Sequence, residues 1–231
     1  MDEDLNADDD LDAGEFSSWL GQMRVALGGR GASDVPCDGC TACCTSAQFV
    51  HIEPNETDTL DHIPPELLFP APGRPDGHML LGYDERGHCP MLGNSGCSIY
   101  EYRPRTCRVY DCRVFSATRV EIDEPAKAGV ARRSRRWRFR FASPDAEVRA
   151  EAVRAAASYL EVHRSDLPGE GRPLGATGRA VLAIELAGVF TSADPATGSP
   201  VVVEPTPTEI AAALDELSDR EPDRGRRRTE R

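Results

Sequence analysis

The spacing of apolar residues along the chain predicts four longer helices. In each of them the apolar positions recur every three or four residues, so that they fall on one helix face. The last helix follows Thr206-Pro207-Thr208-Glu209, a capping box with proline at the first helical position. The predicted helices cover residues 16–27, 144–160, 179–190 and 207–217.

Short strands are predicted between and beside these helices. Residues 48–52 and 79–83 are short apolar runs, and the segment 63–78 between them holds five prolines, so we expect an irregular loop there. Residues 136–141 alternate arginine with an aromatic residue, which is the period of a β-strand. That strand would have one aromatic face and one arginine face.

Composition separates a central domain from polar ends. Residues 1–15 hold eight acidic residues and no basic one, so we expect residues 1–14 to be a disordered acidic tail. Residues 191–207 contain four prolines and are interpreted as a linker, and a short helix and charged tail follow over 208–231. The remaining segment, 15–190, is then the folded domain with its flanking helices.

Charge is distributed unevenly along the 231 residues. The chain has 27 Lys and Arg against 39 Asp and Glu, a net charge of −12, which argues against a general nucleic-acid-binding protein. Residues 101–140 nevertheless hold 12 basic and five acidic residues. The dense arginines of 132–140 leave an anion- or RNA-binding role open, although a half-buried strand with a solvated face explains their alternation better.

The chain shows no sequence feature of a membrane or secreted protein. No apolar run approaches the roughly 18–20 residues needed to cross a bilayer. The acidic N-terminus is the opposite of a signal peptide, which carries a basic start and an apolar core. We therefore expect a soluble, cytoplasmic protein with no membrane partner.

Eight cysteines, all between residues 37 and 112, carry the main chemical signal. In a reducing compartment, clustered cysteines are more often metal ligands than disulfide partners. The first four form the pattern Cys37-x2-Cys40-x2-Cys43-Cys44, and the two-residue gaps let successive thiolates converge from a tight turn. We predict all eight as metal ligands: Cys37, Cys40, Cys43, Cys44, Cys89, Cys97, Cys107 and Cys112.

The sequence around the later cysteines extends this pattern. It contains Gly87-His88-Cys89-Pro90-Met91-Leu92, Gly96-Cys97-Ser98-Ile99-Tyr100, Arg103-Pro104 and Cys107-Arg108. Together with the first four cysteines, these motifs resemble the bacterial YkgJ-type cysteine-cluster family over roughly residues 37–115. The resemblance implies a zinc- or iron-chelating domain of the CxxCxxCC kind. Flagellin lysine methylases are similar in the same cysteine pattern, which keeps an enzymatic role open.

The donor set favours an iron–sulfur cluster over zinc but leaves both open. Eight thiolates exceed the four that one tetrahedral zinc ion takes. The adjacent Cys43 and Cys44 are expected to point apart, so they would serve two neighbouring centres or only one of them would bind directly. Three cysteines at two-residue gaps plus the remote Cys89-Pro90 are similar to the ligands of bacterial ferredoxins, although there the fourth cysteine follows much more closely.

Four arginines lie among the later cysteines. Arg103 and Arg108 match the family motif, and we expect them to donate hydrogen bonds to cysteine sulfur at the cofactor, because arginine does not compete as a ligand. We expect Arg105 and Arg113 to be solvated surface residues. Eight cysteines already satisfy an ordinary metal site, so His51 and His88 are expected to be ordinary strand or loop residues.

These observations predict an α+β fold, a small metal-stapled domain with short strands and loops, flanked by packed helices. Metal coordination would supply part of the folding free energy of such a domain. The predicted function is a metal-binding cysteine-cluster protein whose centre is structural or transfers electrons. The alternatives are an iron–sulfur-dependent enzyme, such as an oxidoreductase or a protein resembling the flagellin lysine methylases, and an anion- or RNA-binding module. No catalytic residue is assigned, the expected partner is the metal ion or cluster, and a nucleic-acid partner is not expected.

Overall fold

The computed structural model describes residues 9–33, 35–37, 39–163 and 175–220. It contains both helices and short strands in small sheets, which confirms the predicted α+β class. None of the described helices is both long enough and apolar enough to cross a membrane. The helices are α1 (Phe16–Leu27), α2 (Thr57–Leu60), α3 (Arg105–Val109), α4 (Arg113–Thr118), α5 (Ala128–Ser134), α6 (Pro144–Val162), α7 (Ala176–Leu186) and α8 (Pro207–Arg220). The strands are β1 (Leu11–Glu15), β2 (Val50–Ile52), β3 (Leu68–Pro70), β4 (Met79–Leu81), β5 (Leu92–Gly93), β6 (Gly96–Cys97), β7 (Trp137–Arg140), β8 (Thr191–Ala193) and β9 (Pro200–Val202).

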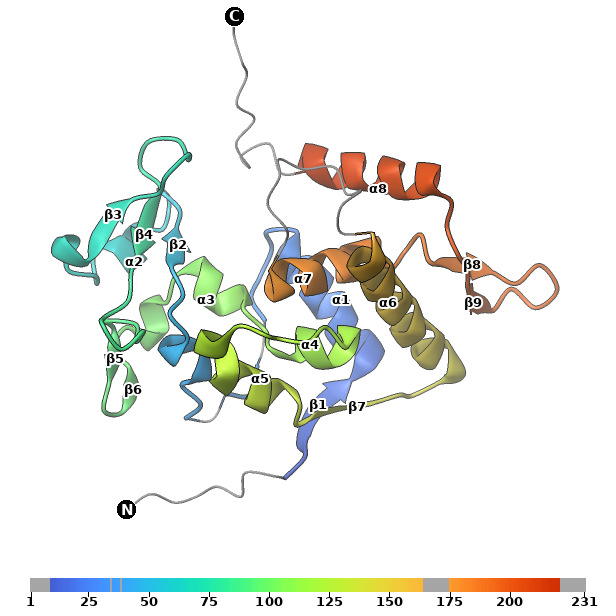
Figure 1. The fold of residues 1–231 in the computed structure, drawn as a ribbon, viewed down its shortest axis with the longest axis horizontal. Helices are drawn as coiled ribbons and strands as arrows, with labels where there is room; N and C mark the ends of the chain where they lie inside the picture. Colours follow the sequence, from blue (N-terminus) through green and yellow to red (C-terminus); the bar gives the residue numbers. More distant parts are fainter. Residues whose placement is uncertain (1–8, 34, 38, 164–174, 221–231) are drawn as a thin grey trace, which may run out of the picture.

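Helices from both ends of the chain pack around one core, which we call the helical core. Helices α1, α4, α6 and α7 gather on one side of the molecule (Figure 1). A second cluster continues this core between α6, α7 and α8. Buried residues of the helical core include Phe16, Trp19, Leu20, Met23, Val114, Phe115, Val130, Val153 and Ile184.

A smaller core, which we call the sheet core, lies on the opposite side of the ribbon (Figure 1). It belongs to a three-stranded antiparallel sheet with the order β2-β4-β3, in which Leu81 of β4 is paired with Val50 and Leu68. Its buried residues are Ile52, Ile63, Leu81 and Ile99. The cysteine-bearing segments run between this small core and the helical core.

The local signals in the sequence place most elements correctly. Helix α1 covers the predicted residues, and α8 begins at the predicted proline. The capping box is formed, because Thr206 N donates to Glu209 Oε2 at 2.7 Å and Glu209 N donates to Thr206 Oγ1 at 3.3 Å. The arginine and aromatic alternation is strand β7, with Trp137 buried and Arg138 exposed.

Two polar segments have more structure than the sequence predicts. Residues 11–15 of the expected acidic tail form β1, a parallel partner of β7, in which Ala13 is buried. Residues 1–8 lie outside the described residues. The expected linker contains the β8–β9 hairpin, whose turn is closed by Asp194 Oδ1 accepting from Ala196 N and Thr197 N. In both cases a partner distant in sequence, or a side chain in the turn, satisfies the polar backbone.

Replacing Ile210 by alanine tests whether α8 is part of the folded body. Ile210 is buried where α8 meets α6 and α7, so the Ile210→Ala variant should lose about 2–4 kcal/mol of unfolding free energy. Urea unfolding followed by circular dichroism measures this loss. The control is Val202→Ala, an exposed apolar residue in β9, which should change the free energy by less than about 0.5 kcal/mol. Equal effects of the two substitutions would contradict the docking of α8.

Candidate metal centre

The first four cysteines lie on a tightly folded loop after α1. Cys40 N donates to Cys37 O at 2.7 Å, which closes a turn around Gly39, a residue at φ +75°. Residues 42–45 then form a single 3-10 turn that carries Cys43 and Cys44. The two-residue gaps therefore fold as the compact loop that the sequence predicts.

Backbone hydrogen bonds join this loop to the later cysteines. Cys89 N donates to Cys44 O at 2.7 Å, and Ala47 N donates to Gly87 O at 2.9 Å. Gly87 has φ +78°, and a Cβ atom there would come within 3.1 Å of the Cβ of Ala47. Only glycine therefore allows this close approach of the two segments.

The remaining cysteines reach the same region from separate elements. Cys97 lies in β6, Cys107 in α3, and Cys112 directly precedes α4. Cys89 and Cys97 pack against the sheet core, whereas Cys112 packs against the helical core. We call this junction between the two cores, where the eight cysteines gather, the seam.

The thiols affect one another electrostatically. Burial, together with the neighbouring Cys43, Cys89 and Cys97, raises the pKa of Cys107 to about 12. Burial likewise raises the pKa of Cys112 to about 12, with contributions from Asp111, Cys37 and Cys40. Thiolates at the seam would repel one another unless a positive charge lay between them. That is the condition that a bound metal or cluster fulfils.

The seam fits a thiolate-bound metal in its donor chemistry. All eight cysteines are free, and none of them is more than partly buried. The described residues contain no group of three or more His, Cys, Asp or Glu side chains already gathered at ligand distances. The fit therefore rests on the nearness and chemistry of the thiols, and binding requires their side chains to turn toward a common point.

Cys43 and Cys44 do not point apart as the sequence suggested. A hydrogen bond with the Cys44 side chain raises the pKa of Cys43. The expectation assumed a strand or a regular helix, but the two residues lie in one 3-10 turn, where their side chains approach each other. Both sulfur atoms can therefore face the same side of the loop.

Polar groups of the helical core reach the seam near Cys112. Trp137 is buried, and its Nε1 donates to Cys112 Sγ at 3.1 Å. Burial raises the pKa of Cys37, and the guanidinium of Arg133, which lies 5.1 Å from the Trp137 ring, offsets part of that rise. An N–H donor or a positive charge beside a cysteine sulfur stabilises the thiolate form that binds metal. The alternation of residues 136–141 predicts only a strand position for Trp137 and gives no sign of its hydrogen bond to Cys112.

Tyr110 adds a buried hydroxyl close to the same cysteines. Its oxygen has no hydrogen-bond partner of ordinary geometry, although Gln48 and Thr177 approach it. Burial raises the pKa of Tyr110, and the nearby Cys112 and Cys43 raise it further. The phenol therefore remains protonated and is a further donor available to an anionic centre at the seam.

Arg103 and Arg108 occupy different surroundings. Arg103 donates from Nε to Tyr100 O at 2.8 Å, and its positive charge offsets a small part of the rise that burial causes in the pKa of Cys37 and Cys107. Arg108 donates to Arg103 O at 2.6 Å and to Glu56 Oε1 at 3.4 Å. The role that the sequence analysis assigned to both arginines, hydrogen bonding to sulfur at the cofactor, stays a prediction.

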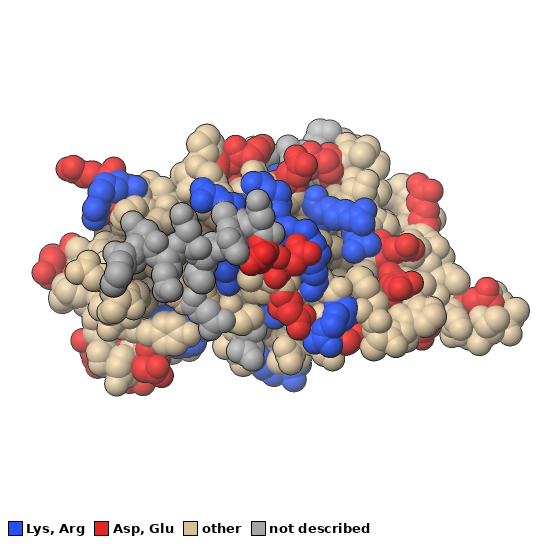
Figure 2. Space-filling model, turned by 90° about the horizontal axis from the view of Figure 1, so that it is seen from below, with Lys and Arg blue, Asp and Glu red and all other residues tan. Residues whose placement is uncertain are grey.

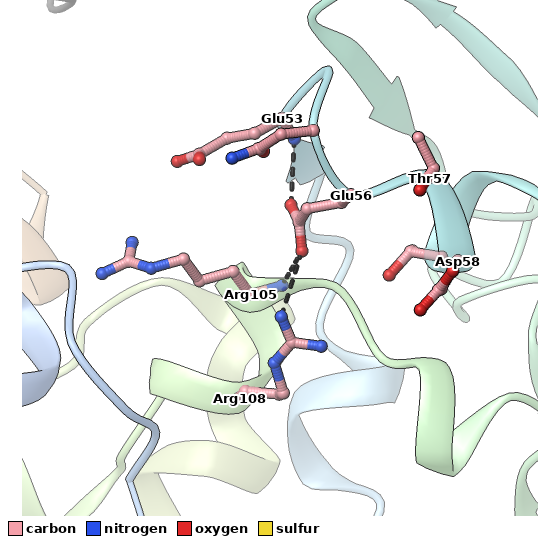
Figure 3. Close-up of a pocket in the computed structure, with 8 residues that line it drawn as sticks. Glu53, Glu56, Thr57, Asp58, Arg105 and Arg108 are labelled. Carbon is pink, nitrogen blue, oxygen red and sulfur yellow. Dashed lines mark hydrogen bonds and ion pairs between the residues drawn. The ribbon is translucent and has the colours of Figure 1, made fainter.

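A pocket lined by charged residues borders α3, the helix that carries Cys107. Glu56 points into this pocket of about 270 Å³ and accepts hydrogen bonds from Glu53 N, Arg105 N and the Arg108 guanidinium (Figure 3). The Arg105 side chain reaches the other way and donates to Ala26 O at 2.8 Å. Arg105 is thus partly buried and connects α3 to α1, so the expectation of a solvated surface residue is wrong.

A buried ion pair flanks Cys112. Arg113 NH2 lies 2.8 Å from Asp111 Oδ2, and both side chains are almost fully buried. The same carboxylate accepts hydrogen bonds from Trp19 Nε1 at 2.9 Å and Ser33 Oγ at 2.6 Å. The expectation that Arg113 is a solvated surface residue is therefore wrong. The opposite charges on either side of Cys112 were the one signal in the sequence that could have indicated this pair.

The two histidines near the motifs have other contacts. His51 Nε2 lies 2.9 Å from His78 Nδ1, the two rings are stacked, and burial lowers the pKa of His51. The backbone N of His88 donates to Asp84 Oδ1 at 2.8 Å, within the turn that precedes Cys89. Both histidines are thus engaged in the small sheet and its connecting turn.

A comparison with family models matches the cysteine-bearing part of the chain. Residues 36–128 match the family described as "CxxCxxCC: Putative zinc- or iron-chelating domain". The match includes all eight cysteines, α3 and α4, and leaves out β1, α1 and everything from β7 onward. No curated protein and no solved structure matches the chain.

Removing the Trp137 indole N–H tests the contact with Cys112. The Trp137→Phe variant keeps an aromatic ring but loses the donor at 3.1 Å from the sulfur, so its metal affinity should fall about 10- to 100-fold. Competition with a chromophoric chelator measures the affinity. The matched control is Trp19→Phe, which removes a buried indole that donates to Asp111 rather than to sulfur. Equal losses in both variants would mean that the effect reflects general destabilisation.

Proposed function

We propose that this protein holds an iron–sulfur cluster at the seam, because residues 36–128 match the CxxCxxCC family of zinc- or iron-chelating domains. One observation carries the proposal: eight free thiols, from separate segments between residues 37 and 112, lie near enough to influence one another electrostatically, and three of them pack against one or other of two hydrophobic cores. We propose as ligands Cys37, Cys40, Cys43, Cys44, Cys89, Cys97, Cys107 and Cys112.

The choice of iron–sulfur over zinc follows from the donors. The candidate ligands are all sulfur, and their number exceeds what one tetrahedral zinc ion takes. Trp137 donates to Cys112, and the positive charges of Arg133 and Arg103 offset part of the rise that burial causes in the pKa of Cys37. Donors and positive charges of this kind set the reduction potential of iron–sulfur clusters. A zinc centre is the second candidate, and the position of the cysteines between two cores favours it for a purely structural role.

The position of the ligands gives the centre a structural role. The sheet core has only four buried residues, too few to keep this part of the chain folded alone. Ligands on both sides of the seam would connect it to the helical core. Coordination by structural zinc in peptides contributes about 10–16 kcal/mol, which shows the size of the effect. Electron transfer is the further role we propose for a cluster, because Cys43 is exposed to solvent.

Metal analysis of anaerobically purified protein tests the proposed cluster. We expect iron and acid-labile sulfide in similar amounts and broad visible absorption. Colourless protein with zinc and no labile sulfide would replace the cluster by the zinc centre. The Cys40→Ala variant should lose bound metal, because it removes the middle ligand of the Cys37–Cys44 loop. Unchanged metal content in that variant would remove Cys40 from the ligand set.

A comparison of Cys107→Ser with Cys40→Ser tests whether the two cysteine sets share one centre. The Cys107 thiol lies near enough to Cys43, Cys89 and Cys97 for their charges to raise its pKa. We expect both variants to lose metal and cooperative thermal melting to the same extent, because a shared centre holds both ends of the intervening loop. Metal content and melting curves are measured on the same samples.

The control for this comparison is Thr106→Ser, which changes the neighbouring residue of α3. Serine keeps a hydroxyl that can donate to His51 O, as Thr106 Oγ1 does at 2.7 Å. This variant should keep its metal and its melting transition. If Cys107→Ser kept half of its metal and melted cooperatively, the two sets would bind independent metals.

A further inference from the structure

The arginine-rich segment before and within β7 takes no part in the proposed centre as a ligand. Six of the nine residues from 132 to 140 are arginine. Trp137 of β7 is buried, whereas Arg138 and Arg140 are exposed. Arg132 and Arg135, at the end of α5, are also exposed. Figure 2 shows Lys and Arg side chains gathered on one face of the molecule, with acidic side chains set among them.

The chain's own N-terminal strand already neutralises part of this surface. Strand β1 pairs in parallel with β7. Arg138 NH2 lies 2.9 Å from Asp10 Oδ1, and Arg140 Nε lies 3.3 Å from Asp12 Oδ1. Arg136 Nε donates to Asp9 O at 2.7 Å. Carboxylates on alternate residues of one extended segment thus face arginines on alternate residues of the other.

We propose that the arginine face of β7 binds the phosphate backbone of single-stranded nucleic acid, and that Asp10 and Asp12 compete with the phosphates for the same guanidinium groups. Side chains on one face of a strand are spaced by about 6.5 Å, close to the repeat of an extended phosphate backbone. The arginine guanidinium group binds phosphate through two parallel hydrogen bonds, as it binds carboxylate. The acidic strand therefore occupies the surface in the way a phosphate chain would.

An aromatic residue follows the last arginine of β7. The ring of Phe141 lies 5.6 Å from that of the buried Phe16 but remains 37% exposed. Exposed rings beside positively charged side chains are the sites on which bases stack in proteins that bind single strands. The exposed part of Phe141 is the feature that a single-stranded nucleic acid would use and an acidic peptide would not.

The acidic competitor is weak enough to be displaced. The side chains of the Arg138–Asp10 pair are 57% and 62% exposed, and those of the Arg140–Asp12 pair are 70% and 66% exposed. Exposed ion pairs contribute little and are screened by salt. A ligand that brings several phosphates at once replaces them, whereas an isolated anion does not.

Binding of a short fluorescent oligouridylate, measured by anisotropy on the full chain, tests the proposal. The Asp10→Asn/Asp12→Asn variant should bind at least threefold more tightly, because both competing carboxylates are removed. The Arg138→Gln/Arg140→Gln variant should bind at least fivefold more weakly. For this variant, the slope of the logarithm of the binding constant against the logarithm of the salt concentration should also become shallower by about 0.7 per lost phosphate contact. Phe141→Ala should weaken binding without changing the salt dependence.

The control for net charge is Asp58→Asn/Asp61→Asn, which also removes two negative charges, but from exposed residues in and directly after α2. An equal gain of affinity in this control would overturn the proposal, because only overall charge would then matter. An oligoglutamate peptide and unlabelled oligouridylate are each tested as competitors of the labelled oligouridylate. If the peptide competed as strongly as the unlabelled oligouridylate, the proposal would be overturned in favour of an acidic protein partner. Arg138→Lys/Arg140→Lys keeps the charge and should restore part of the affinity, which excludes misfolding as the cause.

Discussion

The cysteines at the seam lie against two different hydrophobic cores, so a ligand bound to them would connect those cores. Cys89 and Cys97 pack against the sheet core, and Cys112 packs against the helical core. The thiols raise one another's pKa, so their charged forms repel without a cation. A metal or cluster at this junction would turn that repulsion into the strongest link between the two halves.

Two polar networks prepare the ligands on the side of the helical core. The buried Asp111–Arg113 pair brackets Cys112 and connects it to Trp19 of α1. Breaking a buried pair of this kind by removing one partner typically costs about 3–5 kcal/mol, because a charge remains uncompensated. Helix α3, which carries Cys107, is held from two sides: Arg105 N donates to Glu56, and the Arg105 side chain donates to Ala26 O of α1. These contacts fix the backbone on which Cys112 and Cys107 are carried.

Charge also organises the pairing of β1 with β7. The acidic residues before α1 would repel one another in a free tail, but opposite β7 they meet a row of arginines. Ala13 is buried in the same strand, and Glu15 caps α1 by accepting from Ser17 N and Ser18 N. The acidic segment thus serves both as the start of the helical core and as a cover for a basic surface.

The sequence by itself determined the features that depend on neighbouring residues. Apolar periodicity and the capping box at Thr206 located the helices, and the spacing of Cys37, Cys40, Cys43 and Cys44 identified the candidate ligands. These signals are local, because a turn or a cap is formed by residues within a few positions of one another. They were enough to predict the α+β class and the metal-chelating family.

Only the tertiary structure decided which polar residues are buried and what they touch. Trp19 and Asp111 are 92 positions apart, Arg105 and Ala26 are 79 apart, and Arg140 and Asp12 are 128 apart. The opposite charge of Asp111 two positions earlier was the one local hint that Arg113 is buried, whereas Arg138 faces solvent on its strand. An arginine remains buried only where the fold brings a carboxylate to it, and that meeting depends on contacts between distant parts of the chain.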